Sequence, residues 1–183
     1  MHEPRRTAWR GRGPGPILGA MIRPRPTARV LLLDPDDRVL LMQARDVHDP
    51  SRPPFWFTVG GGVDEGESVL EAAHREIIEE TGLRPTTVGP LLWYAEATIR
   101  GFDGEPMLMQ EHYVLARCEA GLLSREGWTE VERSFALDMR WWTLDEIIRS
   151  AETIYPIDLA RRLAAFFTDE DSRAGKAPRR TRR

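Results

Sequence analysis

The stretch Gly61-Gly-Val-Asp-Glu-Gly-Glu67, followed after seven residues by Arg75-Glu-Ile-Ile-Glu-Glu-Thr-Gly-Leu83, decides how this chain folds. Its second half belongs to the segment Ser68 to Thr81, which contains helix-forming residues and no internal Gly or Pro. Gly82 follows this segment directly, and a Gly in that position is typical of a helix C-terminus. The sequence therefore predicts a helix from Ser68 to Thr81, entered through a glycine-rich loop.

Three glutamates of this helix, Glu76, Glu79 and Glu80, are predicted to share one face. Residues three and four apart are neighbours on a helix, so the three side chains occupy a sector of about 100°. The sector borders an apolar stripe that is expected to pack on a sheet and consists of Leu70, Ala73, Ile77 and Ile78. Three carboxylates so placed repel one another and favour a cation among them. Since Mg²⁺ and Mn²⁺ prefer oxygen ligands, the pattern predicts a site for one of these ions.

The complete pattern resembles the Nudix box, and its defining positions are filled by Gly61, Glu67, Arg75, Glu76, Ile77, Glu79, Glu80, Gly82 and Leu83. The resemblance extends from about Pro26 to Phe167, and one departure is Val59, where many relatives have Pro. It implies an α/β chain with the Nudix fold, which is an α/β/α sandwich with a mixed β-sheet.

The resemblance also implies the members of a metal site. In the family, carboxylates of the box bind the ion together with a backbone carbonyl of the glycine loop, and several relatives add an acid from a later strand. The ligands expected here are Gly61 (or its neighbour Gly62), Glu76, Glu79, Glu80 and Glu111. Arg75 lies four residues from Glu79 and can orient its carboxylate. The residues expected to take part in catalysis are therefore Arg75, Glu76, Glu79, Glu80 and Glu111.

The general base stays open at this point. Glu80, Glu76 or an acid outside the box could accept the proton. Outside the box, Glu111 is the leading candidate, and its rivals are Glu130 and Glu132 in the loop-like stretch Thr129 to Arg133.

The predicted reaction is hydrolysis of a pyrophosphate bond in a nucleoside diphosphate linked to another group, by attack of a metal-activated water. A nucleoside triphosphate, an oxidised nucleotide and a nucleotide-sugar are all candidate substrates. One alternative is a non-catalytic Nudix-like module that senses a nucleotide, which the three intact glutamates disfavour. Another is an isomerase of isoprenoid diphosphates, which the lack of a Cys near the glycine loop disfavours.

Composition limits the partners of the chain. The net charge of −3 argues against a specific nucleic-acid partner, and no apolar stretch is long enough for a membrane span. The one cysteine, Cys118, lies in an apolar run and is expected to be buried. We therefore expect a cytoplasmic enzyme with a nucleotide-type small molecule as its partner, and the family resemblance adds a homodimer as an open expectation.

The 183 residues divide into three expected regions. Residues 1–26 are rich in Arg, Gly and Pro and predict a flexible leader, in which Met21 is a candidate start. Residues 27–168 form the expected Nudix domain, and residues 169–183 a basic, disordered tail. Within the domain, strands are predicted at Arg29–Asp34, Val39–Gln43, Phe55–Val59, Leu91–Ile99, Met107–Arg117 and Met139–Thr143, and further helices at Leu144–Ser150 and Ile157–Phe167.

Overall fold

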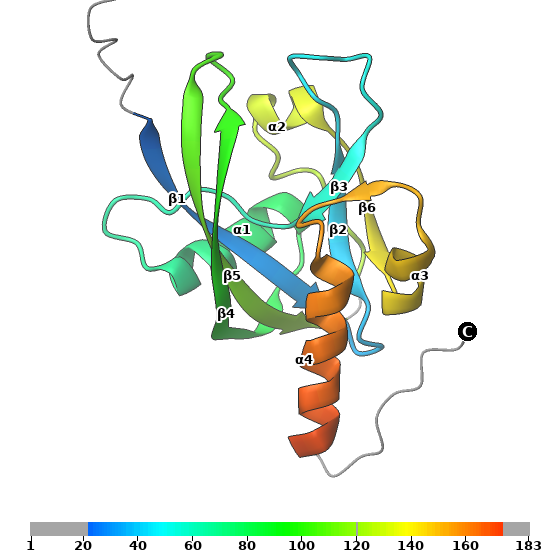
Figure 1. Cartoon of the computed structure of the whole chain (residues 1–183). Coiled ribbons are helices and arrows are strands. Elements are labelled where there is room, and N and C mark those ends of the chain that lie inside the picture. Colours follow the sequence, from blue (N-terminus) through cyan, green and yellow to red (C-terminus); the bar gives the residue numbers. More distant parts are fainter. Residues whose placement is uncertain (1–21, 120, 174–183) are drawn as a thin grey trace, which may run out of the picture.

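A computed structural model describes residues 22–119 and 121–173 of the chain (Figure 1). In chain order, its elements are β1 (Arg23–Leu33), β2 (Val39–Ala44), β3 (Phe55–Thr58), α1 (Val69–Thr81), β4 (Pro85–Arg100), β5 (Pro106–Cys118), α2 (Glu130–Phe135), β6 (Ala136–Trp142), α3 (Leu144–Arg149), β7 (Thr153–Ile154) and α4 (Leu159–Arg173). Every predicted strand and helix is present.

The strands form one mixed sheet. Their order is β4-β5-β1-β2-β3-β7, and β6 pairs with β2 beside this path. β1 runs parallel to β5, and β3 runs parallel to β7, whereas the other pairs are antiparallel. β4 and β5 form a long hairpin that stands beside the start of β1 in Figure 1.

Both faces of the central strands β1 and β2 are buried, because helices cover each side of the sheet there. Successive strand residues point to opposite faces. In β1, Val30 and Leu32 pack in the cluster that contains Ile77 of α1, whereas Leu31 and Leu33 pack in the cluster that contains Leu163 of α4. The sheet therefore lies between α1 on one side and α3 and α4 on the other, which confirms the predicted sandwich with a mixed sheet.

Several elements extend beyond their predicted boundaries, including β4, which begins at Pro85, and β6, which begins at Ala136. β1 already begins at Arg23, inside the expected leader, because its first residues pair with β5 from Met107 onward. α4 continues to Arg173, into the expected tail. The loop-like stretch around Glu132 is in fact the short helix α2, which begins after Thr129 with a capping box. Met21 and the tail from residue 174 lie outside the described residues.

Helix α1 begins and ends as the sequence predicts. Ser68 is the N-cap and forms a capping box with Glu71, and Gly82 ends the helix with a left-handed φ of 72°. Ala73 and Ile77 are fully buried, as expected. Leu70 is 43% exposed, so its assignment to the buried stripe was wrong. Leu70 lies next to Gly89 in the edge strand β4, where the sheet covers it only partly.

Two further expectations concern burial and membranes. Cys118 is 3% exposed and belongs to the core cluster on the α1 side, as predicted. Within the described ranges, no helix combines the length and the apolar character that crossing a bilayer requires.

Candidate active site

Glu76 and Glu80 lie in the buried face of α1. Their exposed fractions are only 7% and 4%. One helical turn before Glu76 the buried residue is Ala72, whose small side chain leaves room beside the carboxylates. Two acidic side chains of α1 therefore lie at its buried face, where apolar side chains are usual.

The carboxylate of Glu80 is bound to the glycine-rich loop. The backbone N–H of Gly60 donates to Oε2 of Glu80 at 2.7 Å. Gly60 has a φ of +132°, and a Cβ there would lie 2.1 Å from the carbonyl oxygen of Ala28. Burial raises the pKa of Glu80 well above its usual range, the Gly60 hydrogen bond opposes that rise, and the charge of Glu76 adds to it.

Glu76 lies against the same loop. Arg75 donates from Nη1 to Oε1 of Glu76 at 2.8 Å. A Cβ on Gly61 would lie 2.3 Å from that oxygen, so any other residue at this position would displace the carboxylate of Glu76. Burial raises the pKa of Glu76, and the bond and charge of Arg75 partly offset this rise.

A third acid, Glu132 of α2, completes the group. Carboxylate oxygens of Glu76, Glu80 and Glu132 all lie within 4.8 Å of one another. The indole N–H of Trp128 donates to the backbone carbonyl of Glu80 at 2.6 Å and so ties the segment before α2 to α1. We refer to Glu76, Glu80 and Glu132 as the acidic triad.

The triad fits a hard divalent cation. All three donors are carboxylate oxygens, which are the ligands that Mg²⁺ and Mn²⁺ prefer. The charge of Glu132 raises the pKa of both Glu76 and Glu80, so the three carboxylates repel one another. A doubly charged ion among them would relieve this repulsion and compensate for the burial of two charges.

Arg75 connects the helix to the loop that precedes it. Its Nε and Nη2 donate to the two carboxylate oxygens of Glu67, both at 2.9 Å, and Nη2 also donates to the carbonyl of Gly62 at 2.9 Å. Nη1 donates to Glu79 at 3.0 Å, as the sequence predicts, and to Glu76. The side chain of Glu79 is 51% exposed and lies outside the triad. The pKa of Arg75 is raised, chiefly by its bonds to Glu67, so it stays charged.

The variant Arg75→Lys should show whether catalysis depends on the positive charge of Arg75 or on the arrangement of its hydrogen bonds. A lysine keeps the positive charge, but its three N–H groups cannot replace the five hydrogen bonds that Arg75 donates to Glu67, Gly62, Glu76 and Glu79. We expect kcat for the preferred substrate to fall about 10–100-fold, which is the usual effect of losing a group that orients metal ligands. A value of kcat within twofold of the wild type would contradict an orienting role. Circular dichroism should show that the variant is folded.

The predicted ligand Glu111 has other partners. Arg29 donates from Nε to Oε1 of Glu111 at 2.9 Å, and the hydroxyl of Tyr113 donates to Oε2 at 3.0 Å. Arg29 also donates to the carbonyl of Gly60 at 3.1 Å. Glu111 is therefore linked to the triad only indirectly: Arg29 binds both Glu111 and Gly60, and Gly60 binds Glu80. The carbonyl of Gly61, another predicted ligand, accepts a hydrogen bond from the backbone N–H of Ala28 at 2.9 Å. Since a carbonyl oxygen has two lone pairs, this bond does not prevent the oxygen from binding an ion.

The sequence does not distinguish Glu132 from Glu130 or Glu111, because the one local signal near Glu132 concerns the start of a helix and not the neighbours of its side chain in space. Thr129 and Glu132 have the spacing of a capping box, which predicts a short helix. In the structure, Thr129 N and Oγ1 both donate to Oε2 of Glu132, at 2.6 and 2.8 Å. Its rival Glu130 is exposed and does not belong to the triad.

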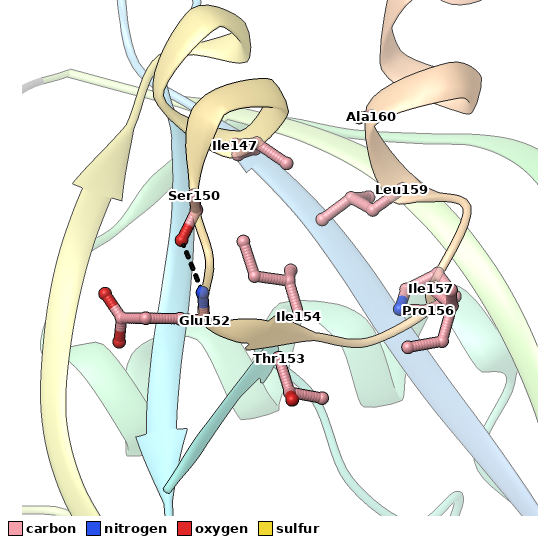
Figure 2. A pocket seen from close by; sticks show the side chains of 9 residues that line it. All are labelled: Ile147, Ser150, Glu152, Thr153, Ile154, Pro156, Ile157, Leu159 and Ala160. Carbon is pink, nitrogen blue, oxygen red and sulfur yellow. Dashed lines mark hydrogen bonds between the residues drawn. The ribbon is translucent and has the colours of Figure 1, made fainter. Parts of the chain in front are cut away.

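A separate cavity of about 320 Å³ lies at the other side of the sheet (Figure 2). It is formed between α3, β7 and the start of α4, and Figure 2 shows the side chains of Ile147, Ile154 and Leu159 around it. Its lining includes no residue of the triad and none of the predicted site residues.

Comparisons with known proteins match most of the chain to one family. Residues 23–163 match the family model described as the NUDIX domain. The "Putative 8-oxo-dGTP diphosphatase" of Bacillus subtilis is 47% identical over 55 residues, which are 30% of this chain and 33% of the relative. An RNA pyrophosphohydrolase of Caulobacter vibrioides is 46% identical over 59 residues, which are 32% of this chain and 33% of the relative. The matches thus span about a third of these curated relatives.

Solved structures share the fold. The Nudix domain of Shewanella oneidensis NrtR, complexed with ADP ribose, superposes with a TM-score of 0.58 at 20% sequence identity. The superposition covers 81% of this chain and 92% of that one. At this identity the likeness concerns the arrangement of strands and helices.

Proposed function

The chain belongs to the Nudix family, and from this premise we propose that it hydrolyses a pyrophosphate bond in a nucleoside diphosphate linked to another group, with Mg²⁺ or Mn²⁺. The substrate class includes nucleoside triphosphates, oxidised nucleotides and nucleotide-sugars. The observation that carries the proposal is the acidic triad, in which two buried carboxylates with raised pKa values lie beside a third.

The ion would be held by Glu76 and Glu80 of the triad, and Glu132 would lie beside it. Glu76 and Glu80 are fixed by Arg75 and by the N–H of Gly60, so their oxygens are already oriented. The proposed set also retains Glu79, Glu111 and the carbonyl of Gly61, although Glu79 and Glu111 would have to leave their present arginine partners. When bound, the ion would neutralise phosphate oxygens and lower the pKa of a coordinated water.

We assign the role of general base to Glu132. Both hydrogen bonds that Thr129 donates to Glu132 end at Oε2. Among the described residues no donor is bound to Oε1, so Oε1 is the atom that would accept a proton from the attacking water. Glu132 is also less buried than Glu76 and Glu80, which allows it to exchange that proton with solvent.

The variant Glu132→Gln tests this assignment, with Glu130→Gln on the same helix as its matched control. Glutamine can preserve the capping box but cannot accept the proton as a carboxylate does. We expect kcat to fall about 10²–10³-fold in Glu132→Gln and to stay near the wild-type value in Glu130→Gln. Equal activities of the two variants in a stopped-time phosphate assay would exclude Glu132 as the base.

The experiment that tests the proposed function is a substrate panel. Wild type and Glu80→Gln are incubated with nucleoside triphosphates, oxidised nucleotides and nucleotide-sugars, with Mg²⁺ or Mn²⁺, and the phosphate-containing products are quantified. We expect metal-dependent turnover of at least one class by the wild type. Turnover of none, together with tight nucleotide binding, would instead assign the chain to the non-catalytic sensors.

Stabilisation by metal should depend on pH. Because the pKa values of Glu76 and Glu80 are raised, their contribution to stability is full below the usual glutamate pKa and is lost as the pH rises through the raised values. A bound ion replaces the proton and recovers that loss. We therefore expect the increase in Tm on adding Mg²⁺ to be larger at about pH 8 than at about pH 5.5. Thermal denaturation at both values measures this, and a larger increase at the lower pH would contradict the account.

A further inference from the structure

Arg25 of β1 carries a guanidinium group that has no carboxylate partner in the part of the chain that the structure describes. A guanidinium without a counter-ion is available to an anionic ligand. The other arginines of β1 and α1 are each paired with an acid: Arg23 with Asp103, Arg29 with Glu111 and Arg75 with Glu67.

The guanidinium of Arg25 lies against the glycine loop of the candidate active site. A Cβ on Gly62 would lie 3.0 Å from Nη2, 3.2 Å from Nε and 3.5 Å from Cζ of Arg25, so the flat head group rests beside the α-carbon of Gly62. The preceding residue, Gly61, faces the carboxylate of Glu76 in the same way. Since consecutive α-carbons are only about 3.8 Å apart, Arg25 and the acidic triad contact neighbouring residues of one loop.

The backbone around Arg25 is held in place. Arg25 precedes Pro26, and a residue before proline is restricted to extended conformations. In the sheet, Arg25 pairs with Met109 of β5, and the carbonyl of Pro26 accepts a hydrogen bond from the N–H of Val63 at 3.0 Å. This bond ties β1 to the glycine loop, which passes beside β1 in Figure 1. The side chain of Arg25 therefore projects from a fixed strand next to the candidate active site.

We propose that Arg25 binds a phosphate group of the substrate beyond the two phosphates of the bond that is cleaved, and that it thereby favours nucleoside triphosphates over nucleotide-sugars. This inference rests on the proposed function and names the substrate class within it. The planar guanidinium donates two parallel N–H groups to two oxygens of one phosphate, a match that the point charge of a lysine does not provide.

The number of phosphates explains the preference. In a nucleotide-sugar, both phosphates belong to the bond that is cleaved, so both lie at the carboxylates and their ion. A nucleoside triphosphate has one phosphate more, and its negative charge is repelled by the acidic triad. Arg25 lies outside the triad but on the same loop, so it supplies the positive charge that this further phosphate requires.

Binding of a nucleoside triphosphate analogue, with methylene groups in place of its bridging oxygens, tests the contact without turnover. Isothermal titration calorimetry with Mg²⁺ gives the dissociation constant of the analogue for the full chain. We expect Arg25→Gln to raise this constant about 10–100-fold, because a charge-assisted contact is lost. Arg23→Gln is the matched control, because it removes the same charge from an arginine that already binds Asp103, and it should change the constant less than about twofold.

Two calorimetric results would overturn the proposal. One is an affinity of Arg25→Gln equal to that of the wild type. The other is an Arg23→Gln variant that binds as weakly as Arg25→Gln, because the loss would then reflect the total charge of this region and not a contact of Arg25. Circular dichroism should show that both variants are folded.

Kinetics test the preference among substrates. The wild type should have a higher kcat/KM for a nucleoside triphosphate than for a nucleotide-sugar. We expect Arg25→Gln to lower the first value about 10–100-fold and the second less than about threefold. An equal decrease for both substrates, or a wild type that prefers the nucleotide-sugar, would overturn the proposal. A wild type that hydrolyses neither would contradict the proposed function, while the calorimetric comparison would still decide whether Arg25 binds phosphate.

Discussion

Replacing Glu80 by Gln is expected to abolish almost all hydrolysis. Glutamine has nearly the same shape, and its side-chain oxygen can still accept the hydrogen bond from Gly60. What it lacks is the negative charge that the cation requires from the triad. We expect kcat to fall on the order of 10³-fold, equivalent to about 4 kcal/mol of transition-state stabilisation. The assay is the metal-dependent release of phosphate-containing products from the best substrate.

The same variant should make the metal-free protein more stable. Burial of the charged Glu80 is unfavourable, which is why its pKa is raised. Removing the charge should increase Tm at about pH 8 without metal by about 2–4 °C, which corresponds to roughly 1 kcal/mol for a domain of this size. Addition of Mg²⁺ should then raise Tm less than in the wild type. A lower Tm together with an unchanged response to Mg²⁺ would assign Glu80 a purely structural role.

Gly60→Ala is expected to have the largest effect on stability. An alanine Cβ would overlap with the carbonyl oxygen of Ala28, 2.1 Å away, at a φ of +132° that L residues rarely adopt. The neighbouring atoms are backbone atoms of β1, which cannot move without disturbing the sheet. We expect a loss of about 3 kcal/mol or more, and a decrease in Tm of about 6–12 °C.

Gly66→Ala is the matched control for this prediction. Gly66 also has a positive φ, +82°, but a Cβ there would meet no atom within 4 Å. Its replacement should therefore cost about 1 kcal/mol, from backbone strain alone. Thermal or urea denaturation of both variants gives the comparison. Equal losses would show that close packing of the glycine loop on β1 contributes nothing to stability.

The central helix and its acids could be predicted from the sequence because they depend on local spacing. Within α1, Glu76 and Glu80 lie four residues apart and therefore share the face that is buried. Glu79 is rotated by 100° from Glu80, which brings it to the margin of that face and into contact with Arg75. The same helical geometry thus explains both the buried pair and the exposed third glutamate.

The third member of the triad could not be placed from the sequence because it depends on tertiary contacts. Glu132 follows Trp128 by four residues, and the indole of Trp128 donates to the carbonyl of Glu80, a residue 48 positions away in the chain. Likewise, no local sequence pattern indicates that Arg29 forms an ion pair with Glu111. Opposite charges on two adjacent strands, β1 and β5, become partners only once the register of the sheet is known.

The most direct test of the central claim is a crystal structure of the full chain grown with Mn²⁺, with anomalous diffraction data. We predict an anomalous peak between Glu76 and Glu80, with carboxylate oxygens of both residues at about 2.1 Å from the ion. The same experiment on Glu80→Gln should show a much weaker peak or none. Wild-type crystals that bind no ion at this position in excess Mn²⁺, with both carboxylates still buried, would contradict the account.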